Sequence, residues 1–208
     1  MLNVGAGAGS YEPSEGPVIA VEPSEVMLSQ RAGRSAPAIR AVGEWLPVRD
    51  RAFDVALAVL TIHHWPDPIA GLRELQRVAS RQVILHFEPD YAFWLADEYF
   101  PNVRAVDAGV PTVAEVVAAL GNTRVEPIPV PHDCVDGFFA AYWRRPGAYL
   151  DPSVRANISN LARVGDGDLG LGLDRLRRDL ASGAWEAEHR DLLARDELDV
   201  GYRLIIAG

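Results

Sequence analysis

The chain begins with Met1 and the stretch Leu2-Asn3-Val4-Gly5-Ala6-Gly7-Ala8-Gly9, which has the pattern of a short apolar strand that runs into a glycine-rich turn. Glycines at alternate positions let the backbone approach a ligand closely, since no side chain stands in the way. A second apolar run, Val18 to Val21, ends in Glu22, whose carboxylate can accept hydrogen bonds from both hydroxyls of a ribose. A strand, a glycine loop, a second strand and an acid predict a nucleoside-binding edge of a parallel sheet.

The first two-thirds of the chain alternates between strand and helix patterns. Such alternation is typical of a parallel sheet with helices on both faces. The expected strands span residues 38–42, 53–60, 82–87 and 124–130, and the expected helices span residues 24–31, 68–78 and 113–120. Pro127 and Pro129 put the last of these strands at a sheet edge, because proline cannot donate a ladder hydrogen bond.

The region after residue 132 breaks the alternation. Residues 137–195 read as several helices, and residues 199–207 read as a final strand rich in β formers. We therefore predict one domain over 1–208, with a core of 1–132 and 196–208 and a helical insertion of about 137–195. The fold class is a Rossmann-like, doubly wound α/β sheet, mostly parallel with an antiparallel last strand. Because ligands bind outside the carboxyl ends of the strands, we expect the insertion to cover the ligand site.

Composition narrows the partners and the compartment. The 208 residues carry a formal net charge of −9, and the 20 cationic residues, all arginine, are scattered, which argues against a nucleic-acid partner. No apolar run approaches the roughly 18 residues of a membrane span, and no secretory signal is visible at the start. The single cysteine, Cys134, fits a reducing compartment. We expect a cytoplasmic protein with a small-molecule substrate and no membrane partner, and the oligomeric state stays open.

Three further features favour one kind of nucleoside cofactor. Ser10 stands where a dinucleotide-binding loop needs its last glycine, so the glycines alternate as G-x-G-x-G. Gly43-Glu44-Trp45-Leu46-Pro47-Val48 precedes the strand that starts at Phe53, and Leu60-Thr61-Ile62-His63-His64-Trp65-Pro66-Asp67 follows that strand. These motifs, together with the final strand, resemble those of class I S-adenosylmethionine-dependent methyltransferases of the small-molecule type, similar to methyltransferase type 11. The resemblance runs continuously from Leu2 to about Pro89.

The resemblance implies a set of cofactor-binding residues at the carboxyl ends of the strands. The glycine loop would line the methionine part, the acid would hold the ribose, and the segment after residue 42 would meet the adenine. The implied set is Asn3, Gly5, Ala6, Gly7, Glu22, Pro23, Met27, Gly43, Glu44, Ala58 and Val59. The implied cofactor is S-adenosyl-L-methionine, and the implied activity is methyl transfer to an O, N or C acceptor.

The substrate side of the site is less defined. Methyl transfer from a sulfonium needs a general base only where the acceptor loses its proton early, so no fixed triad is expected. His64 and His132 are the candidate catalytic bases. The candidate substrate contacts are His64, Glu88, His132, Tyr142 and Trp143. His63 and His64 would point to opposite sides of an extended segment, so no metal site is expected.

Three departures from the family pattern keep two alternatives open. Asn3 stands where an acid is usual, and Val42 stands where an acid often reads the adenine. Between Gly5 and Glu22 only about Ser10 to Glu15 could be helical, roughly one turn. The alternatives are a non-catalytic binding domain with a methyltransferase fold and an NAD-dependent oxidoreductase. Ser10 and the His-His-Trp-Pro-Asp segment argue against the oxidoreductase.

Overall fold

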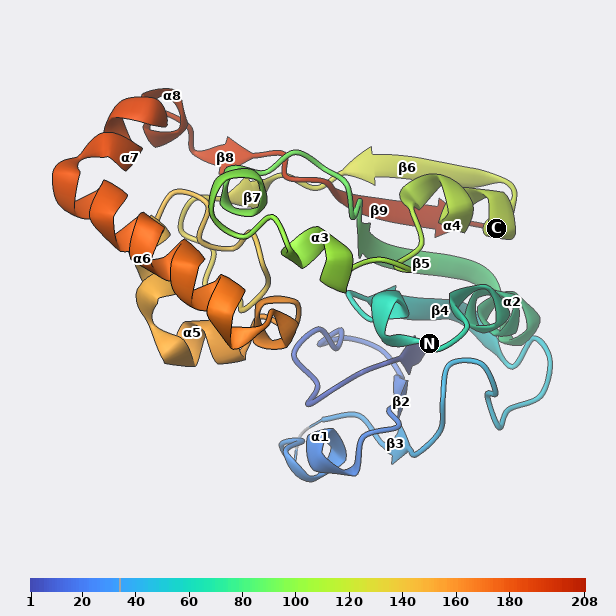
Figure 1. Cartoon of the computed structure of the whole chain (residues 1–208). Helices are drawn as coiled ribbons and strands as arrows, with labels where there is room; N and C mark the ends of the chain where they lie inside the picture. The colour runs from blue at the N-terminus through green and yellow to red at the C-terminus, as the bar shows by residue number, and fades with distance from the viewer. Residues whose placement is uncertain (34) are drawn as a thin grey trace. The chain divides into compact units, whose positions relative to one another are not determined.

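The computed structural model describes residues 1–33 and 35–208, and these fall into two compact units (Figure 1). The first unit comprises residues 1–88, 110–127 and 203–208, and the second comprises residues 89–109 and 128–202. Residues 89–109, which the sequence analysis assigned to the core, therefore belong with the later helical region. Each unit is described by itself below.

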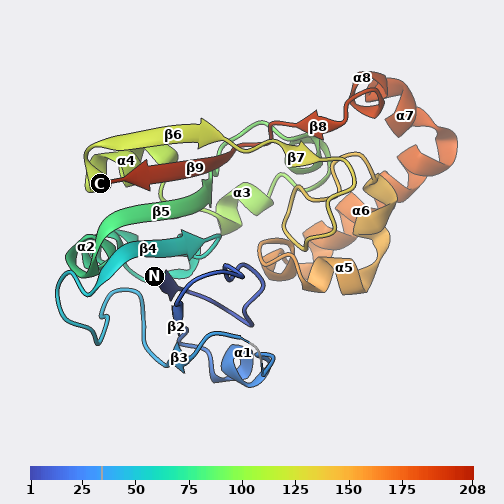
Figure 2. The same ribbon diagram turned by 180° about the vertical axis from the view of Figure 1, so that it is seen from behind.

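A seven-stranded sheet in the order β3-β2-β1-β4-β5-β9-β6 forms the centre of the first unit. Its strands are β1 (Leu2–Val4), β2 (Ile19–Val21), β3 (Ala38–Ile39), β4 (Phe53–Val59), β5 (Ala79–Phe87), β6 (Thr123–Pro127) and β9 (Tyr202–Ala207). The ladders from β3 to β5 are all parallel, whereas β6 and β9 are antiparallel to each other. In Figure 2 the arrows of β4 and β6 point the same way and that of β9 points the opposite way. The predicted Rossmann-like fold, with its antiparallel last strand, is confirmed.

The strand register brings the predicted ligand-binding segments to one edge of the sheet. Val4 is paired with Val21, so the residues that follow, Gly5 and Glu22, leave the sheet at the same level. Asn3 is paired with Leu57, so β4 ends at this same edge. Parallel strands present their carboxyl ends together, and ligands of such folds bind there.

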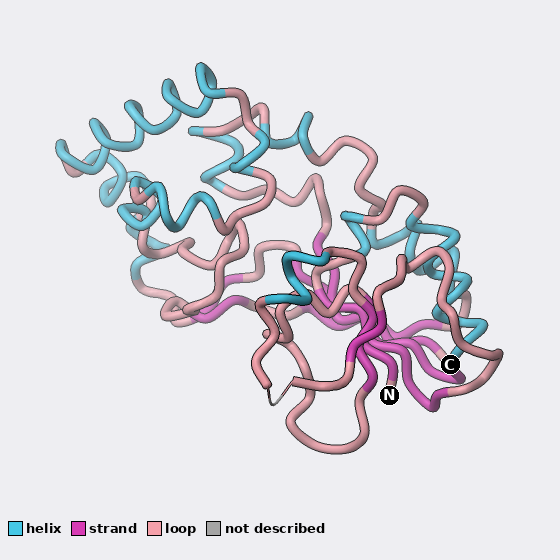
Figure 3. The backbone as a smooth tube through the Cα atoms, turned by 90° about the horizontal axis from the view of Figure 1, so that it is seen from below, coloured by secondary structure: helices cyan, strands magenta, loops and turns pink. Residues whose placement is uncertain are grey.

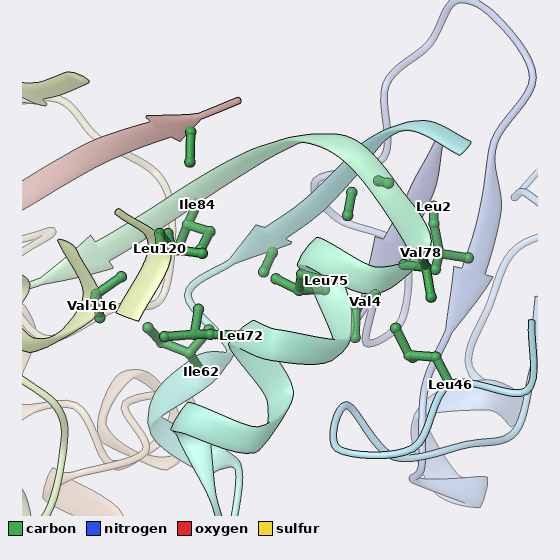
Figure 4. Close-up of a cluster of buried hydrophobic side chains, with 14 of the residues drawn as sticks. Leu2, Val4, Leu46, Ile62, Leu72, Leu75, Val78, Ile84, Val116 and Leu120 are labelled. Atoms are coloured by element: carbon green, nitrogen blue, oxygen red, sulfur yellow. The ribbon is translucent and has the colours of Figure 1, made fainter. Parts of the chain in front are cut away.

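Two helices of the first unit enclose an aliphatic core with the sheet. Helix α2 (Pro68–Val78) is capped by Asp67, whose side chain accepts a hydrogen bond from the Ala70 N–H. Its Leu72, Leu75 and Val78 are fully buried and point toward the sheet (Figure 4). Helix α4 (Val113–Leu120) packs beside α2. Both helices have the bounds that their apolar spacing predicts.

The connection between β1 and β2 differs from the usual strand–helix–strand unit. Residues 5–18, all of them described, form turns and bends and no helix, so even the single turn expected over Ser10–Glu15 is absent. Pro13, Gly16 and Pro17 interrupt any helical ladder there. The next helix, α1 (Glu25–Ser29), is shorter than the expected span of residues 24–31, and the Ser24 side chain caps it. Strand β3 is also shorter than predicted.

The second unit is built of one long helix, several short helical segments and turns. Figure 3 draws it almost entirely in the colours of helix and loop. Its helical segments are η2 (Leu95–Tyr99), α3 (Val103–Val106), η3 (Pro146–Leu150), α5 (Pro152–Ala156), η4 (Leu161–Arg163), α6 (Asp166–Ser182), α7 (Ala184–Glu188) and α8 (Arg190–Leu193). A two-stranded antiparallel sheet joins β7 (Val130–Pro131) to β8 (Glu197–Leu198). In the part of the chain that the structure describes, no helix is long and apolar enough to cross a membrane.

Aromatic side chains form the core of the second unit. Trp143, Tyr149 and Trp185 are almost fully buried. The ring of Trp94 meets those of Tyr149 and Trp185 edge to face, with centroids 6.0 and 5.2 Å apart. The indole N–H of Trp94 donates to the Trp143 carbonyl at 3.1 Å, and that of Trp143 donates to the Val130 carbonyl at 2.9 Å. Trp94 thus explains why residues 89–109 belong to this unit.

Candidate functional site

The glycine loop is tied to the end of β2 and to the segment after β4. The N–H groups of Gly5 and Ala6 both donate to the Val21 carbonyl, at 2.8 and 3.1 Å. A Cβ on Gly5 would lie 1.9 Å from the Thr61 Oγ1, so this glycine permits the close approach of Thr61. A Cβ on Gly7 would meet nothing within 4 Å, and its φ is +54°. The backbone at Gly7 is therefore open on its Cβ side.

Glu22 is fixed beside this loop. Its Oε2 accepts the Gly7 N–H at 2.8 Å and its Oε1 accepts the Ser24 N–H at 2.9 Å. The residue is 7% exposed, and neither donor carries a charge. A carboxylate oxygen has two lone pairs, so each oxygen keeps one for a further donor. The predicted ribose acid is thus oriented and still able to accept hydrogen bonds.

The two motifs that flank β4 form one packed unit around Trp65. A Cβ on Gly43 would lie 2.7 Å from the Trp65 ring, and a Cβ on Gly71 would lie 2.2 Å from it. The Glu44 Oε1 accepts the Asp67 N–H at 3.1 Å. The Trp65 ring therefore explains why both positions are glycine. The Glu44 carboxylate already accepts a hydrogen bond from within the protein. Contact of these residues with adenine stays a prediction that concerns their backbone.

A charged cluster on α2 holds the segment that follows Glu44. The Leu46 N–H donates to Glu74 and its carbonyl accepts from Arg77, both at 2.9 Å. Arg77 also binds the Val48 carbonyl and Asp50, each at 2.8 Å. The hydrogen bond from Arg77 lowers the pKa of Glu74, and the bond to Glu74 raises the pKa of Arg77. The segment 46–50 is therefore fixed by α2.

The remaining predicted cofactor residues lie along the same strand ends. Asn3 and Ala58 are buried within β1 and β4, Ala6 is buried in the loop, and Val59 is half-buried. Pro23 and Met27 are exposed at the start of α1. The structure thus brings the loop, the β2 acid and the β4 end together within the first unit, while the cofactor roles of these residues stay predictions.

His64 and Glu88 differ in what they can offer a substrate. His64 is exposed, and its ring lies 3.8 Å from that of His63. The Glu88 Oε2 accepts the Val113 N–H at 3.2 Å, which places this carboxylate at the first turn of α4. Among residues 1–33 and 35–208, no His, Cys, Asp and Glu side chains cluster in a way that could hold a metal ion. His64 is therefore the stronger candidate of the two for a reacting group.

The substrate candidates of the second unit need one correction. Trp143 is fully buried and its N–H is bonded to Val130, so it is a core residue with no surface for a substrate. Tyr142 is half-buried, with its ring 5.7 Å from that of Tyr149 and the Arg145 guanidinium over it at 4.9 Å. His132 is half-buried, and its backbone N–H donates to the Asp196 carbonyl at 2.8 Å.

Three buried polar side chains of the first unit were not identified from sequence patterns. Glu12 and Arg31 form an ion pair with side chains 9% and 7% exposed. His86 is fully buried on β5 and donates from Nε2 to the Pro111 carbonyl at 2.7 Å. The burial lowers the pKa of His86 to about 4, although the bond to Pro111 opposes this. Glu12 lies in a turn-rich segment without periodicity, so no local signal could have identified its partner.

Known methyltransferases resemble this chain in sequence and in fold. A methyltransferase domain family model matches residues 2–87. A protein assigned as a methyltransferase of an antibiotic biosynthesis pathway in Anabaena variabilis is 31% identical, with a TM-score of 0.91 over 100% of this chain and 90% of that one. An S-adenosylmethionine-dependent methyltransferase from Thermotoga maritima is 25% identical, with a TM-score of 0.52 over 62% of this chain and 66% of that one. The YcgJ protein of Bacillus subtilis, 17% identical with a TM-score of 0.51 over 99% of this chain and 88% of that one, shares the fold.

A search of curated protein sequences finds no match. The match to the Anabaena protein extends over both units, whereas the family model covers the strands that carry the glycine loop, Glu22 and the His-His-Trp-Pro-Asp segment. Neither result supports the oxidoreductase or the non-catalytic domain. This chain belongs to the class I S-adenosylmethionine-dependent methyltransferases.

Proposed function

We propose that this enzyme transfers the methyl group of S-adenosylmethionine to an O, N or C acceptor on a small molecule in the cytoplasm. The observation that carries the proposal is the Glu22 carboxylate, held by the N–H groups of Gly7 and Ser24 at the carboxyl edge of the sheet. The net charge of −9 argues against a polyanionic acceptor such as nucleic acid. The resemblance to small-molecule methyltransferases supports the same substrate class.

The residues present fit the cofactor. A ribose needs an acceptor for two hydroxyl donors, and Glu22 keeps one lone pair on each oxygen. The open space at Gly7 admits a ligand against the backbone. Met27 is 43% exposed and supplies apolar surface at the start of α1, after Glu22, where the adenine is expected. We infer that Glu22 holds the ribose, the glycine loop holds the methionine part and Met27 contacts the adenine.

The chemistry needs little from the protein beyond placement. When bound, S-adenosylmethionine supplies an electrophilic methyl group on a sulfonium, whose departure leaves a neutral thioether. Glu22 and the loop backbone fix the donor, and a positioned donor and acceptor gain a large rate advantage from proximity alone. We infer that the buried residues at this edge, Ala6 and Ala58 among them, help to exclude water from a bound methyl donor.

His64 is the group we propose for proton transfer. It is exposed just after β4, and an imidazole is suited to this task near neutral pH. For an O–H or N–H acceptor, an imidazole nitrogen of His64 would take the proton as the new bond to carbon forms. For a carbon acceptor, it would take the proton after transfer. His132, in the second unit, is the other candidate for this role.

Calorimetry with S-adenosylhomocysteine tests the cofactor part of this proposal. The wild-type protein should bind, and Glu22→Ala should weaken binding about tenfold or more, because a charge-assisted pair of hydrogen bonds is lost. Ser14→Ala, a change at an exposed residue in the same connection, is the control. Wild-type protein that shows no heat of binding at millimolar ligand would contradict the assignment of this edge as the cofactor site.

The acceptor class is tested with a tritium-labelled methyl donor and a fractionated cell extract. We expect label in the small-molecule fraction, and less of it with His64→Gln. Label that accumulates in protein or nucleic acid instead would overturn the proposed substrate class while leaving the cofactor assignment intact. Label transferred equally by wild type and His64→Gln would remove His64 from the mechanism.

A further inference from the structure

The ion pair of Glu12 and Arg31 occupies the place where a methyltransferase usually has its first helix. Residues 5–18 form no helix, so they lack the continuous ladder that would hold the glycine loop. Instead, Arg31 reaches back from just beyond α1. Its guanidinium donates to the Gly7 carbonyl at 3.1 Å, to the Ala36 carbonyl at 3.0 Å and to the Glu12 carboxylate. The Ala36 N–H in turn donates to Glu12 at 2.9 Å.

These contacts link three separate parts of the chain: the loop after β1, the end of α1 and the turn before β3. We call the set formed by Glu12, Arg31 and their contacts with Gly7 and Ala36 the loop brace. Its two charged side chains are each more than nine-tenths buried. A charge pair withdrawn from water exchanges hydrogen bonds to solvent for those within the fold, so removing one partner leaves the other charge buried without compensation.

The brace and the cofactor acid meet at one residue. The Gly7 N–H donates to Glu22 at 2.8 Å, and the Gly7 carbonyl accepts from Arg31 at 3.1 Å. Gly7 is therefore held from both sides, in a left-handed conformation with φ of +54°. A cation at its carbonyl polarises the Gly7–Ala8 peptide, so the Ala8 N–H becomes a stronger donor. A helix dipole would favour an anion at this loop, and the arginine supplies positive charge by another route.

We propose that Glu12 and Arg31 are positioning residues for cofactor binding, which fix the glycine loop through Gly7 in place of the absent first helix. This inference rests on the proposed cofactor site, but the order it predicts in the loop is a property of the free protein. An exposed pair nearby offers a matched comparison: Arg40 and Glu25 lie 3.0 Å apart with side chains 62% and 79% exposed.

The first measurement is hydrogen exchange in the protein without ligand, for wild type, Arg31→Met, Arg31→Lys, Glu12→Gln and the control Arg40→Met. Local exchange reports the free energy of local opening. We expect residues 5–12 to exchange about tenfold faster or more in Arg31→Met and Glu12→Gln, with β4 and β5 unchanged. Arg31→Lys should lie between, because an ammonium lacks the planar fork that serves several acceptors. Arg40→Met should match the wild type.

The second measurement is S-adenosylhomocysteine affinity by calorimetry, together with KM for the methyl donor and kcat. Both brace variants should raise Kd and KM by about tenfold, with kcat at saturating donor changed by less than about twofold. A residue needed only for global stability would not produce this split in a folded variant. Arg31→Lys should recover part of the affinity, and Arg40→Met should keep all of it.

The outcomes distinguish failure of the loop brace from failure of the proposed cofactor site. If Arg31→Met does not fold, Glu12→Gln and Arg31→Lys carry the test, since each keeps a polar side chain of similar size. Folded brace variants with exchange in residues 5–12 and Kd within about twofold of wild type would overturn the brace. If the wild type binds no S-adenosylhomocysteine, the proposed function fails, yet selectively faster exchange of residues 5–12 would still support a brace that orders the loop.

Discussion

The two compact units solve the same packing problem with different side chains. The first buries an aliphatic core, in which Leu72, Leu75 and Val78 of α2 meet a parallel sheet. The second buries aromatic rings, with Trp143 and Trp185 among its largest buried side chains, among helical segments that are mostly short. Regular elements satisfy their own backbone groups, whereas an irregular chain leaves carbonyls that need partners. The indole N–H groups of Trp94 and Trp143 supply such partners, so each of these side chains fills space and also satisfies a backbone carbonyl.

This difference predicts how each unit tolerates substitution. In the aliphatic core of the first unit, side chains such as Leu72 and Leu75 carry no polar group, so shape and volume decide the cost of a change. At Trp143 or Tyr149 in the second unit, a replacement must fill a larger volume and also provide a hydrogen-bond donor. Tyr149 illustrates the point, because its hydroxyl donates to the Phe139 carbonyl at 2.8 Å while its ring packs against Trp94.

The largest effect we predict is that of Trp143→Ala. It should cost the second unit about 3–5 kcal/mol, because a fully buried indole leaves a large cavity. The loss also leaves the Val130 carbonyl without the donor that now lies 2.9 Å away. Urea unfolding, followed by a probe in each unit, measures the change. We expect the transition of the second unit to move to lower urea.

Conservative substitutions compare the two cores more directly. Trp143→Phe keeps an aromatic ring but removes the N–H, so it should still cost about 1–3 kcal/mol. Leu72→Met in α2 keeps volume and apolar character and should cost less than about 1.5 kcal/mol. Equal costs for these two variants would mean that the donor function of Trp143 contributes nothing, and that the two cores obey the same rule.

His86 is a buried titratable side chain of the first unit, unlike the aliphatic residues of its core. It is a fully buried imidazole on β5, and its burial lowers its pKa to about 4 from an ordinary value of about 6.5. Between these two pH values the unfolded chain binds a proton that the folded protein excludes. Stability is therefore complete above about pH 6.5, falls by up to ~3 kcal/mol as the pH drops to about 4, and loses no more from this group below that.

His86→Gln tests this directly, because an amide can donate to the Pro111 carbonyl but does not titrate. Chemical unfolding of both proteins at pH 8, 6, 5 and 4 gives the comparison. We expect the stability difference between wild type and variant to shift in favour of the variant by up to ~3 kcal/mol between pH 8 and pH 4. Parallel curves at all four values would show that His86 is not the origin of any acid sensitivity.

Much of the first unit could be predicted because its order is periodic and local. Apolar residues recur at helical spacing in residues 68–78 and 113–120. The caps Asp67 and Thr112 each stand directly before the helix that they cap. The glycine loop and Glu22 follow strands directly, so parallel topology brings them together. Predictions failed where long-range contacts decide the structure. Trp143 was expected at a substrate pocket, yet Val130 and Trp94 place it in a core.

The part of the candidate site that escaped prediction is also long-range. Glu12 and Arg31 lie on opposite sides of a strand and a helix in the sequence, and only the fold brings them together. Trp65 likewise explains Gly43 by a contact that no spacing rule contains. Sequence patterns therefore locate the backbone of such a site, whereas the charged groups that steady it depend on three-dimensional packing.

The smallest predicted effect compares one glycine in each unit. Gly7 has φ of +54° and Gly183, at the end of α6, has φ of +76°, and a Cβ on either would meet nothing within 4 Å. Because the left-handed conformation is unfavourable for alanine, Gly7→Ala and Gly183→Ala should each cost about 1 kcal/mol of stability. Only Gly7→Ala should also weaken S-adenosylhomocysteine binding, since a methyl group there intrudes on the space where the ligand would approach. Thermal unfolding and calorimetry on the two variants measure both effects. Equal affinities would show that the open side of Gly7 faces solvent rather than the cofactor, and would move the proposed site away from this loop.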